Sequence, residues 1–109
     1  MSSSPSPITG QFYQVATVSE IAPGDSKAVS VNGRQMALFN VNGAFYAIDD
    51  ACPHRGAPLS EGYVKGEQVL CNWHCFDFHL RTGACEVVPE LKVSTYEVKV
   101  EGEIVFVLC

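Results

Sequence analysis

The sequence predicts an all-β protein, an antiparallel β-sandwich or partly closed barrel with a smaller subdomain inserted between its strands. Two dipeptides, Asn32-Gly33 and Asn42-Gly43, separate β-prone runs, and Asn-Gly is a strong signal for a two-residue hairpin turn. Apolar and polar residues alternate in several runs, as expected for strands with one buried face. With 47% hydrophobic and 17% charged residues, the 109-residue chain has the composition of one globular domain.

The predicted strands follow one another with short connections, apart from one long loop at 49–66. The strands are expected at residues 12–17, 27–31, 35–41, 44–48, 68–72, 76–80, 95–100 and 103–108. In the strand at 95–100, the alternation predicts that Tyr96, Val98 and Val100 face the core. The strand at 103–108 is apolar almost throughout and is predicted to be buried. Weak helical signals lie near 19–21 and 60–63.

The N-terminal residues 1–10 are rich in Ser and Pro and are predicted to form a disordered tail before a single domain at 11–109. The tail has neither the basic nor the apolar region of a secretory signal, and no apolar run approaches the roughly 18 residues that span a bilayer. A soluble, cytoplasmic protein without a membrane partner is therefore expected. A formal charge of −5 argues against nucleic acid as a partner. It suits a positively charged protein partner, or simply keeps a small protein in solution.

Four potential metal ligands occur as Cys52-x-His54 and Cys71-x-x-His74. Thiolate and imidazole groups bind soft and borderline metals, and such short spacings let one tight turn direct two side chains at one centre. The pattern predicts two facing loops that close over a metal site. Its occupant is either one zinc ion or a two-iron, two-sulfur cluster, in which two Cys bind one iron and two His the other.

The residues around these ligands resemble a known family. Cys-Pro-His-Arg-Gly-Ala-Pro-Leu at 52–59 and Cys-Asn-Trp-His-Cys-Phe-Asp-Phe at 71–78 are similar to the two ligand boxes of Rieske iron–sulfur proteins. The resemblance extends from about Phe12 to Leu108, and is greatest to the soluble Rieske-type ferredoxins of ring-hydroxylating dioxygenases and to small subunits of assimilatory nitrite reductases. It implies a Rieske-type β-sandwich with a cluster-binding subdomain at about 46–88.

The resemblance also implies how the ligands divide. Cys52 and Cys71 would bind the inner iron of one [2Fe-2S] cluster, and His54 and His74 would bind the outer iron with their imidazole edges near the surface. The chain would then be a monomeric one-electron carrier and not itself an enzyme, because no second metal constellation remains once both His are used. Its partners would be a flavoprotein reductase and a terminal oxygenase.

Two other functions remain open at this stage. The chain could be the small Rieske subunit of an assimilatory nitrite reductase, with the large subunit as its partner. Alternatively, Cys52, His54, Cys71 and His74 could form a closed tetrahedral zinc site in a protein-interaction module. Such a zinc protein would be colourless.

A low reduction potential within the Rieske range is also implied. Respiratory Rieske proteins have an extra Cys in each box, where this chain has Ala57 and Trp73. They also have Ser and Tyr hydroxyls beside the cluster, where this chain has Phe76 and Phe78. Because hydrogen bonds to the sulfurs stabilise the reduced state, their loss lowers the potential.

Other Cys and His residues, and one further segment, lie outside the predicted ligand set. Cys75 replaces the Gly that usually follows the second His, and it is predicted to be a small, partly buried free thiol; the alternatives are a further ligand or a thiol that pairs with Cys85. Free thiols are also expected for Cys85 and Cys109. His79 is predicted to be a surface residue. The segment Val87-Val88-Pro89 is either a third loop that covers the cluster, as in the family, or an ordinary strand connection.

Overall fold

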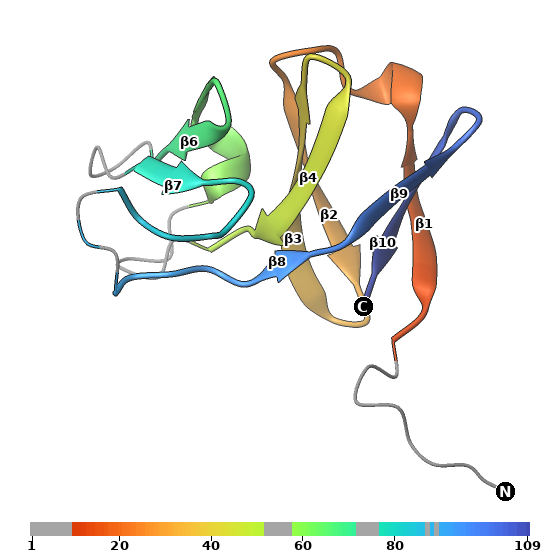
Figure 1. Ribbon diagram of the computed structural model, residues 1–109. Coiled ribbons are helices and arrows are strands. Elements are labelled where there is room, and N and C mark those ends of the chain that lie inside the picture. Colours follow the sequence, from red (N-terminus) through yellow and green to blue (C-terminus); the bar gives the residue numbers. More distant parts are fainter. Residues whose placement is uncertain (1–9, 52–57, 72–76, 87, 89) are drawn as a thin grey trace, which may run out of the picture.

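The computed structural model describes residues 10–51, 58–71, 77–86, 88 and 90–109, and the strands among them form three antiparallel sheets (Figure 1). A four-stranded sheet stands in the middle of the molecule. A three-stranded sheet formed by the two chain ends lies on one side of it, and a second three-stranded sheet lies on the other. The prediction of an all-β, antiparallel fold is confirmed.

The sheet of the chain ends has the order β1-β10-β9 and contains β1 (Phe12–Thr17), β9 (Val98–Glu101) and β10 (Ile104–Leu108). The strand predicted at 12–17 has these bounds in the structure. A β-bulge interrupts the pairing of β1 with β10 between Gln14 and Ala16. Strand β10 was predicted to be buried throughout, but it alternates, and Val105 and Val107 face the core.

The central sheet has the order β2-β3-β4-β8, with β2 (Ser26–Val31), β3 (Arg34–Val41), β4 (Ala44–Asp49) and β8 (Thr95–Tyr96). Both predicted Asn-Gly hairpins are present. Asn32 and Gly33 have φ values of 51° and 80°, and Asn42 and Gly43 have values of 52° and 95°. Positive φ at both central residues is what a type I′ turn requires, and this explains the Asn-Gly sequence.

The second three-stranded sheet has the order β5-β6-β7, with β5 (Tyr63–Lys65), β6 (Gln68–Leu70) and β7 (Asp77–His79). Two short 3₁₀ turns, η1 (Val18–Glu20) and η2 (Leu59–Glu61), lie near the weak helical signals. Strand β5 falls inside the stretch predicted to be a loop. In this respect the prediction was wrong, because a three-residue strand between Gly62 and Gly66 is too short to show a clear period.

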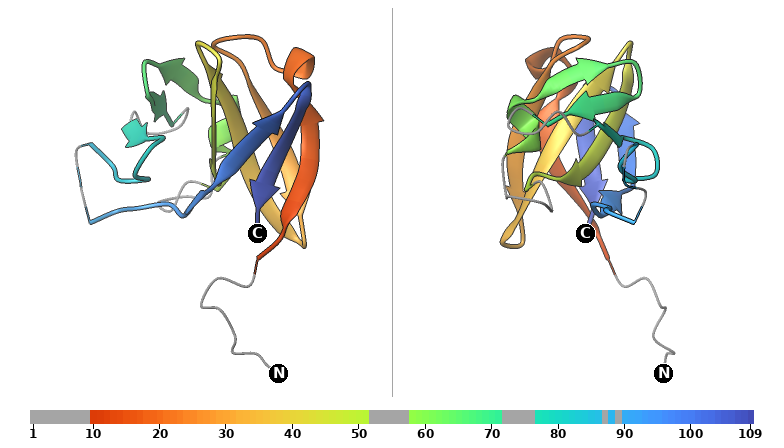
Figure 2. Two further views of the ribbon diagram at one scale, coloured as in Figure 1. Left: turned by 45° about the vertical axis from the view of Figure 1, so that its right-hand side comes forward. Right: turned by 90° about the vertical axis from the view of Figure 1, so that its left-hand side faces the viewer.

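Strand β3 is buried on both faces from Met36 to Phe39, because it lies between two hydrophobic cores. The ribbon views show the central sheet, to which β3 belongs, between the other two sheets (Figures 1 and 2). Met36 and Leu38 join the core between the two sheets of the sandwich, whereas Ala37 and Phe39 join the core beneath the β5-β6-β7 sheet. A strand buried on both faces is expected to be continuously apolar, and β3 is so from Met36 to Phe39. The central sheet is therefore the layer on which both other sheets pack.

The predicted strand at 95–100 is divided in the structure. Tyr96 pairs with Ala47 of β4, whereas Val98 pairs with Val107 of β10, so the chain changes sheets at Glu97. Val100 was predicted to face the core, but 44% of it is exposed, because β9 is the edge strand of its sheet. None of the helices in the described residues has the length and apolar character needed to cross a membrane.

Candidate metal centre

Of the four predicted ligands, Cys71 lies in the described part of the chain, and Cys52, His54 and His74 lie outside it. Cys71 directly follows β6 and is only 1% exposed. The placement of the other three ligands remains a prediction. What the structure shows for each ligand loop is where the loop begins and ends.

The first loop is closed at its base. Ala51 and Pro58, on either side of residues 52–57, form an antiparallel bridge. Asp50 binds the chain just beyond, because its carbonyl oxygen accepts from the Leu59 amide at 2.6 Å and its Oδ1 from the Ser60 amide at 2.8 Å. The two ends of the segment that carries Cys52 and His54 are therefore held side by side.

The second loop is the connection of the predicted hairpin. Strands β6 and β7 pair through Val69 with Phe78 and Leu70 with Asp77, so that residues 71–76 join their ends. Cys71 therefore starts this connection. A hairpin fixes the positions of both ends of its loop. The second ligand box therefore begins at the end of β6, as the sequence predicted.

Both loop ends rest on the same hydrophobic core. Leu59, which follows the first loop, and Cys71 and Phe78, which flank the second, are buried in one cluster together with Cys85. This cluster also includes Phe39 from the central sheet. The sulfur of Cys71 is thus placed in a water-poor environment beside the described ends of both loops, which suits a ligand of a buried metal.

A third segment lies beside β7. Cys85 forms a bridge with Phe78, and the Glu86 amide donates to the Asp77 carbonyl oxygen at 2.8 Å. The Val88 amide donates to the Cys85 sulfur at 3.4 Å. Residues 87 and 89 of the predicted third loop lie outside the described part, as does Cys75. The described residues place the start of this segment next to the second ligand hairpin.

His79, which was predicted to be a surface residue and not a ligand, has protein partners for both ring nitrogens. Its Nε2 lies 2.6 Å from Glu86 Oε1, and its Nδ1 lies 3.5 Å from Gln68 Nε2. The side chain is 36% exposed. These contacts hold the imidazole on the outer face of β7.

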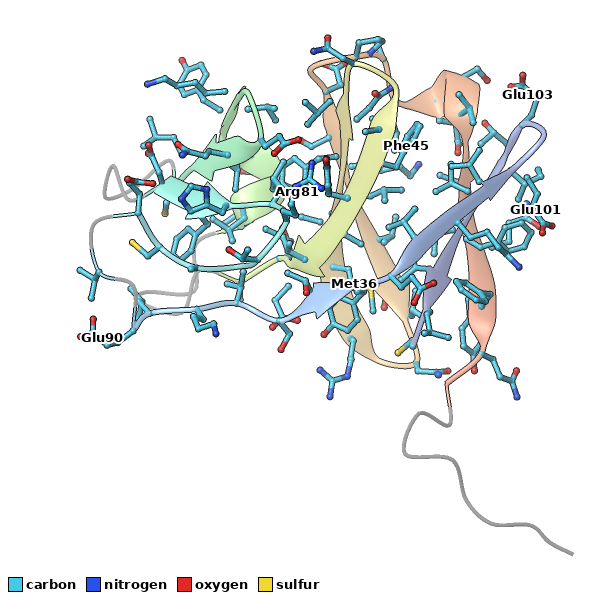
Figure 3. All side chains as sticks on the ribbon, in the orientation of Figure 1. Met36, Phe45, Arg81, Glu90, Glu101 and Glu103 are labelled. Atoms are coloured by element: carbon cyan, nitrogen blue, oxygen red, sulfur yellow. The ribbon has the colours of Figure 1, made fainter. Side chains whose placement is uncertain are left out.

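Sequence reasoning missed a polar cluster that joins the β5-β6-β7 sheet to the central sheet. Arg81 donates through Nη2 and Nε to the two Glu67 carboxylate oxygens, at 2.6 and 3.3 Å, and Tyr46 of β4 donates to the same carboxylate at 3.1 Å. Figure 3 shows Arg81 between these two sheets. The Arg81 hydrogen bonds lower the pKa of Glu67 from its usual value. Nothing in the sequence pairs these residues, because they lie in separate turns and strands.

A second polar cluster holds the strand that leads into the first loop. Tyr96 donates to Asp49 Oδ1 at 2.6 Å and accepts from Arg34 Nη1 at 3.0 Å, and the Asp49 amide donates to the Ser94 carbonyl oxygen at 3.0 Å. Burial, together with the Asp49 carboxylate, raises the pKa of Tyr96. Asp49 ends β4, so these contacts fix the chain shortly before Cys52.

The raised pKa of Tyr96 predicts a pH dependence of stability. Folding disfavours the phenolate, because the Tyr96 phenol loses its proton less readily in the folded protein than in the unfolded chain. The stability that the neutral phenol contributes is therefore complete below the unfolded pKa of about 10, and it is lost as pH rises through the higher folded pKa. From pH 8 to pH 11, wild type should therefore lose more unfolding free energy in urea titrations than Tyr96→Phe. Tyr63→Phe, which alters an exposed phenol, should follow wild type. Equal losses in all three proteins would contradict the prediction.

Comparison with known proteins identifies relatives over most of the chain. The model of the family described as the Rieske [2Fe-2S] domain matches residues 11–97. The ferredoxin component of the naphthalene 1,2-dioxygenase system of Pseudomonas aeruginosa is 34% identical over 101 residues, which cover 92% of this chain and 97% of the relative.

Solved structures show the same fold. The ferredoxin of carbazole 1,9a-dioxygenase from Nocardioides aromaticivorans IC177 has a TM-score of 0.82 and 31% identity, covering 89% of this chain and 96% of its own. A complex of reduced oxygenase and oxidized ferredoxin in carbazole 1,9a-dioxygenase contains a chain with a TM-score of 0.81 and 31% identity, at 88% and 91% coverage. A putative NADH-dependent nitrite reductase small subunit from Mycobacterium tuberculosis has a TM-score of 0.87 at 24% identity, with 92% and 96% coverage.

Proposed function

The chain belongs to the Rieske [2Fe-2S] domain family, and on this premise we propose that Cys52, His54, Cys71 and His74 hold its one [2Fe-2S] cluster. Cys52 and Cys71 bind the inner iron, and His54 and His74 bind the outer iron. Two observations support this assignment. Cys71 is buried at the start of the second loop, and both loop bases rest on one core. The cluster-binding subdomain is proposed to span about residues 46–88.

The donor set fits such a cluster. When bound, it supplies a centre that gains and loses one electron, and replacing two thiolates by imidazoles makes reduction easier than in an all-Cys ferredoxin. The chain itself keeps water from Cys71 by packing it with Leu59 and Phe78. The bridge between Ala51 and Pro58 and the β6-β7 hairpin hold the ends of the two loops in place.

The chain is proposed to carry one electron at a time from a flavoprotein reductase to a terminal oxygenase. The observation that carries this proposal is the 34% identity, over nearly the whole chain, with a ferredoxin component of a dioxygenase system. The complex of oxygenase and ferredoxin supports the choice of acceptor. We propose that it acts as a monomeric carrier and is not itself an enzyme. Free thiols at Cys85 and Cys109 favour the cytoplasm, where thiols stay reduced.

A nitrite reductase small subunit is the alternative. Its structure superimposes well, with a TM-score of 0.87, but at 24% identity this likeness shows the fold alone. The higher identity to dioxygenase ferredoxins favours the oxygenase as acceptor. Rates of electron transfer from the reduced protein to an oxygenase component and to a nitrite reductase large subunit would separate the two functions.

The experiment that tests the cluster is visible absorption and low-temperature EPR of the purified protein, before and after reduction with dithionite. A red-brown protein with two irons per chain is expected, and its reduced form should have the low average g value of mixed His and Cys ligation. A colourless, EPR-silent protein with one zinc per chain would refute the proposal. It would indicate a closed zinc site instead.

Phe78→Tyr is expected to raise the reduction potential. Phe78 is fully buried with Cys71, at the position where respiratory Rieske proteins have a Tyr. A new hydrogen bond of about 0.5–1.5 kcal/mol that favours the reduced state corresponds to roughly 20–65 mV for one electron. Protein-film voltammetry measures this shift, with Phe45→Tyr, which alters the other core, as control. A destabilised protein with an unchanged potential would show that no such bond forms.

A further inference from the structure

The outer face of the β5-β6-β7 sheet carries a row of side chains beside the second ligand loop. Tyr63 pairs with Leu70, and Leu70 pairs with Asp77. Directly paired residues of antiparallel strands point to the same face. The opposite face is turned to the core and consists of Val64, Val69 and Phe78. Tyr63, Leu70 and Asp77 therefore point outward.

This row has an apolar end that is open to solvent. Tyr63 is 71% exposed, the largest exposed fraction among the large hydrophobic residues that the structure describes. Leu70, beside it, is half-buried. Leu70 also directly precedes Cys71, so the apolar end of the row is continuous with the loop that is proposed to hold the cluster.

The other end of the row is acidic. Glu86 lies next to Asp77, because its amide donates to the Asp77 carbonyl oxygen, and it points outward because its neighbour Cys85 faces the core. The Glu86 carboxylate reaches along this face to His79 Nε2, at 2.6 Å. Asp77 forms no ion pair with any residue of the described part. Lys65, on the same sheet, lies in the next row, where it pairs with Gln68.

We propose that the row of Tyr63, Leu70, Asp77 and Glu86 is a docking face for the electron acceptor, a redox protein with a basic surface. This inference rests on the proposed function and names the surface through which it is carried out. Tyr63 and Leu70 provide the apolar contact, and Asp77 and Glu86 attract the Lys and Arg side chains of the partner. An exposed aromatic side chain bordered by charge is typical of interface anchors. Because Leu70 directly precedes the proposed ligand Cys71, a partner bound to this face is expected to lie within a short transfer distance of the cluster.

The test changes the charge of this face. It measures the second-order rate constant of electron transfer from the reduced holoprotein to cytochrome c, a basic haem protein. The variants are Tyr63→Lys, Tyr63→Glu and the double variant Asp77→Asn with Glu86→Gln. Matched controls are Val100→Lys, Val100→Glu and the double variant Glu101→Gln with Glu103→Gln. Val100 is also an exposed apolar strand residue, and Figure 3 shows Glu101 and Glu103 at the opposite end of the molecule from β6 and β7.

At low ionic strength, Tyr63→Lys and the Asp77/Glu86 double variant should slow the reaction, by about two- to threefold per unit of charge, and Tyr63→Glu should accelerate it by a similar factor. With ferricyanide, an anionic acceptor, each of these effects should reverse in sign. The effects should fade at high salt, where screening acts over a few ångströms. A merely structural effect on the iron–sulfur cluster would change the rates of electron transfer to both acceptors in the same direction.

Three outcomes decide the matter. The docking face is supported if Tyr63→Lys and Tyr63→Glu change the rate of electron transfer in opposite directions, while the two Val100 variants change it little. Equal responses at Tyr63 and Val100, or none at either, overturn it, while wild-type electron transfer would leave the proposed function in place. If the wild-type protein holds no reducible cluster and reduces neither acceptor, the proposed function fails as well, and the docking proposal fails with it.

Discussion

Cys71→Ala is expected to abolish the visible absorption of the purified protein and to reduce its iron content to near zero. Cys71 is the proposed inner-iron ligand that the structure places, buried at the start of the second loop. Alanine offers no electron pair to iron, and a single remaining thiolate cannot hold the inner iron. We expect the apo variant to remain folded, because the loss of one buried sulfur atom costs only about 1 kcal/mol. Iron analysis and circular dichroism measure the two effects.

Cys85→Ala is the matched control for this experiment. Cys85 is also a cysteine, is also 1% exposed and belongs to the same hydrophobic cluster, but it lies outside both ligand boxes. The two variants therefore remove the same atoms from the same core. Cys85→Ala should keep its colour and its two irons. If Cys85→Ala lost the cluster and Cys71→Ala retained it, the ligand assignment would be wrong.

Leu59→Ala is expected to destabilise the protein by about 2–5 kcal/mol and also to loosen the cluster. Leu59 is fully buried just after the first loop, and its amide donates to the Asp50 carbonyl oxygen at the base of that loop. Truncation leaves a cavity at the point where both ligand loops rest. Release of iron to a chelator, measured well below the unfolding temperature, should therefore be faster than in wild type.

Leu38→Ala separates this local effect from a general loss of stability. Leu38 is equally buried, but it lies in the core between the two sheets of the sandwich. Urea unfolding should show a similar loss of free energy for the two variants. Iron release from Leu38→Ala should stay close to wild type under the same conditions. Equal acceleration in both variants would mean that cluster retention follows global stability alone.

The sequence predicted those elements that have a local cause. The Asn-Gly turns and the strand at 12–17 were correct, because positive φ values and β-propensity are properties of a few neighbouring residues. Strand β5 was missed, although one signal was present. A side chain at Gly62 would collide with the Leu70 carbonyl oxygen, so this glycine marks the close approach of β6.

Other features depend on parts of the chain that are distant in sequence. The alternation at 95–100 correctly indicated a strand, but it does not encode the change of sheets at Glu97 or the edge position of Val100. For the site, the two ligand boxes were recognisable because their spacing is local. The contacts of Arg81 with Glu67 and of Tyr96 with Asp49 were not, because only the folded sheets bring these residues together.

Strand β3 belongs to two cores at once, with Met36 and Leu38 on one side and Ala37 and Phe39 on the other. Neither half of the molecule can unfold without exposing one face of this strand, which would leave the other half with an open apolar surface. The sandwich and the β5-β6-β7 sheet should therefore unfold as one cooperative unit on heating. The β3 amides should be among the slowest to exchange with solvent. Unfolding of the β5-β6-β7 half on its own is therefore disfavoured, so that release of iron well below the unfolding temperature depends on local packing at the loop bases, as at Leu59.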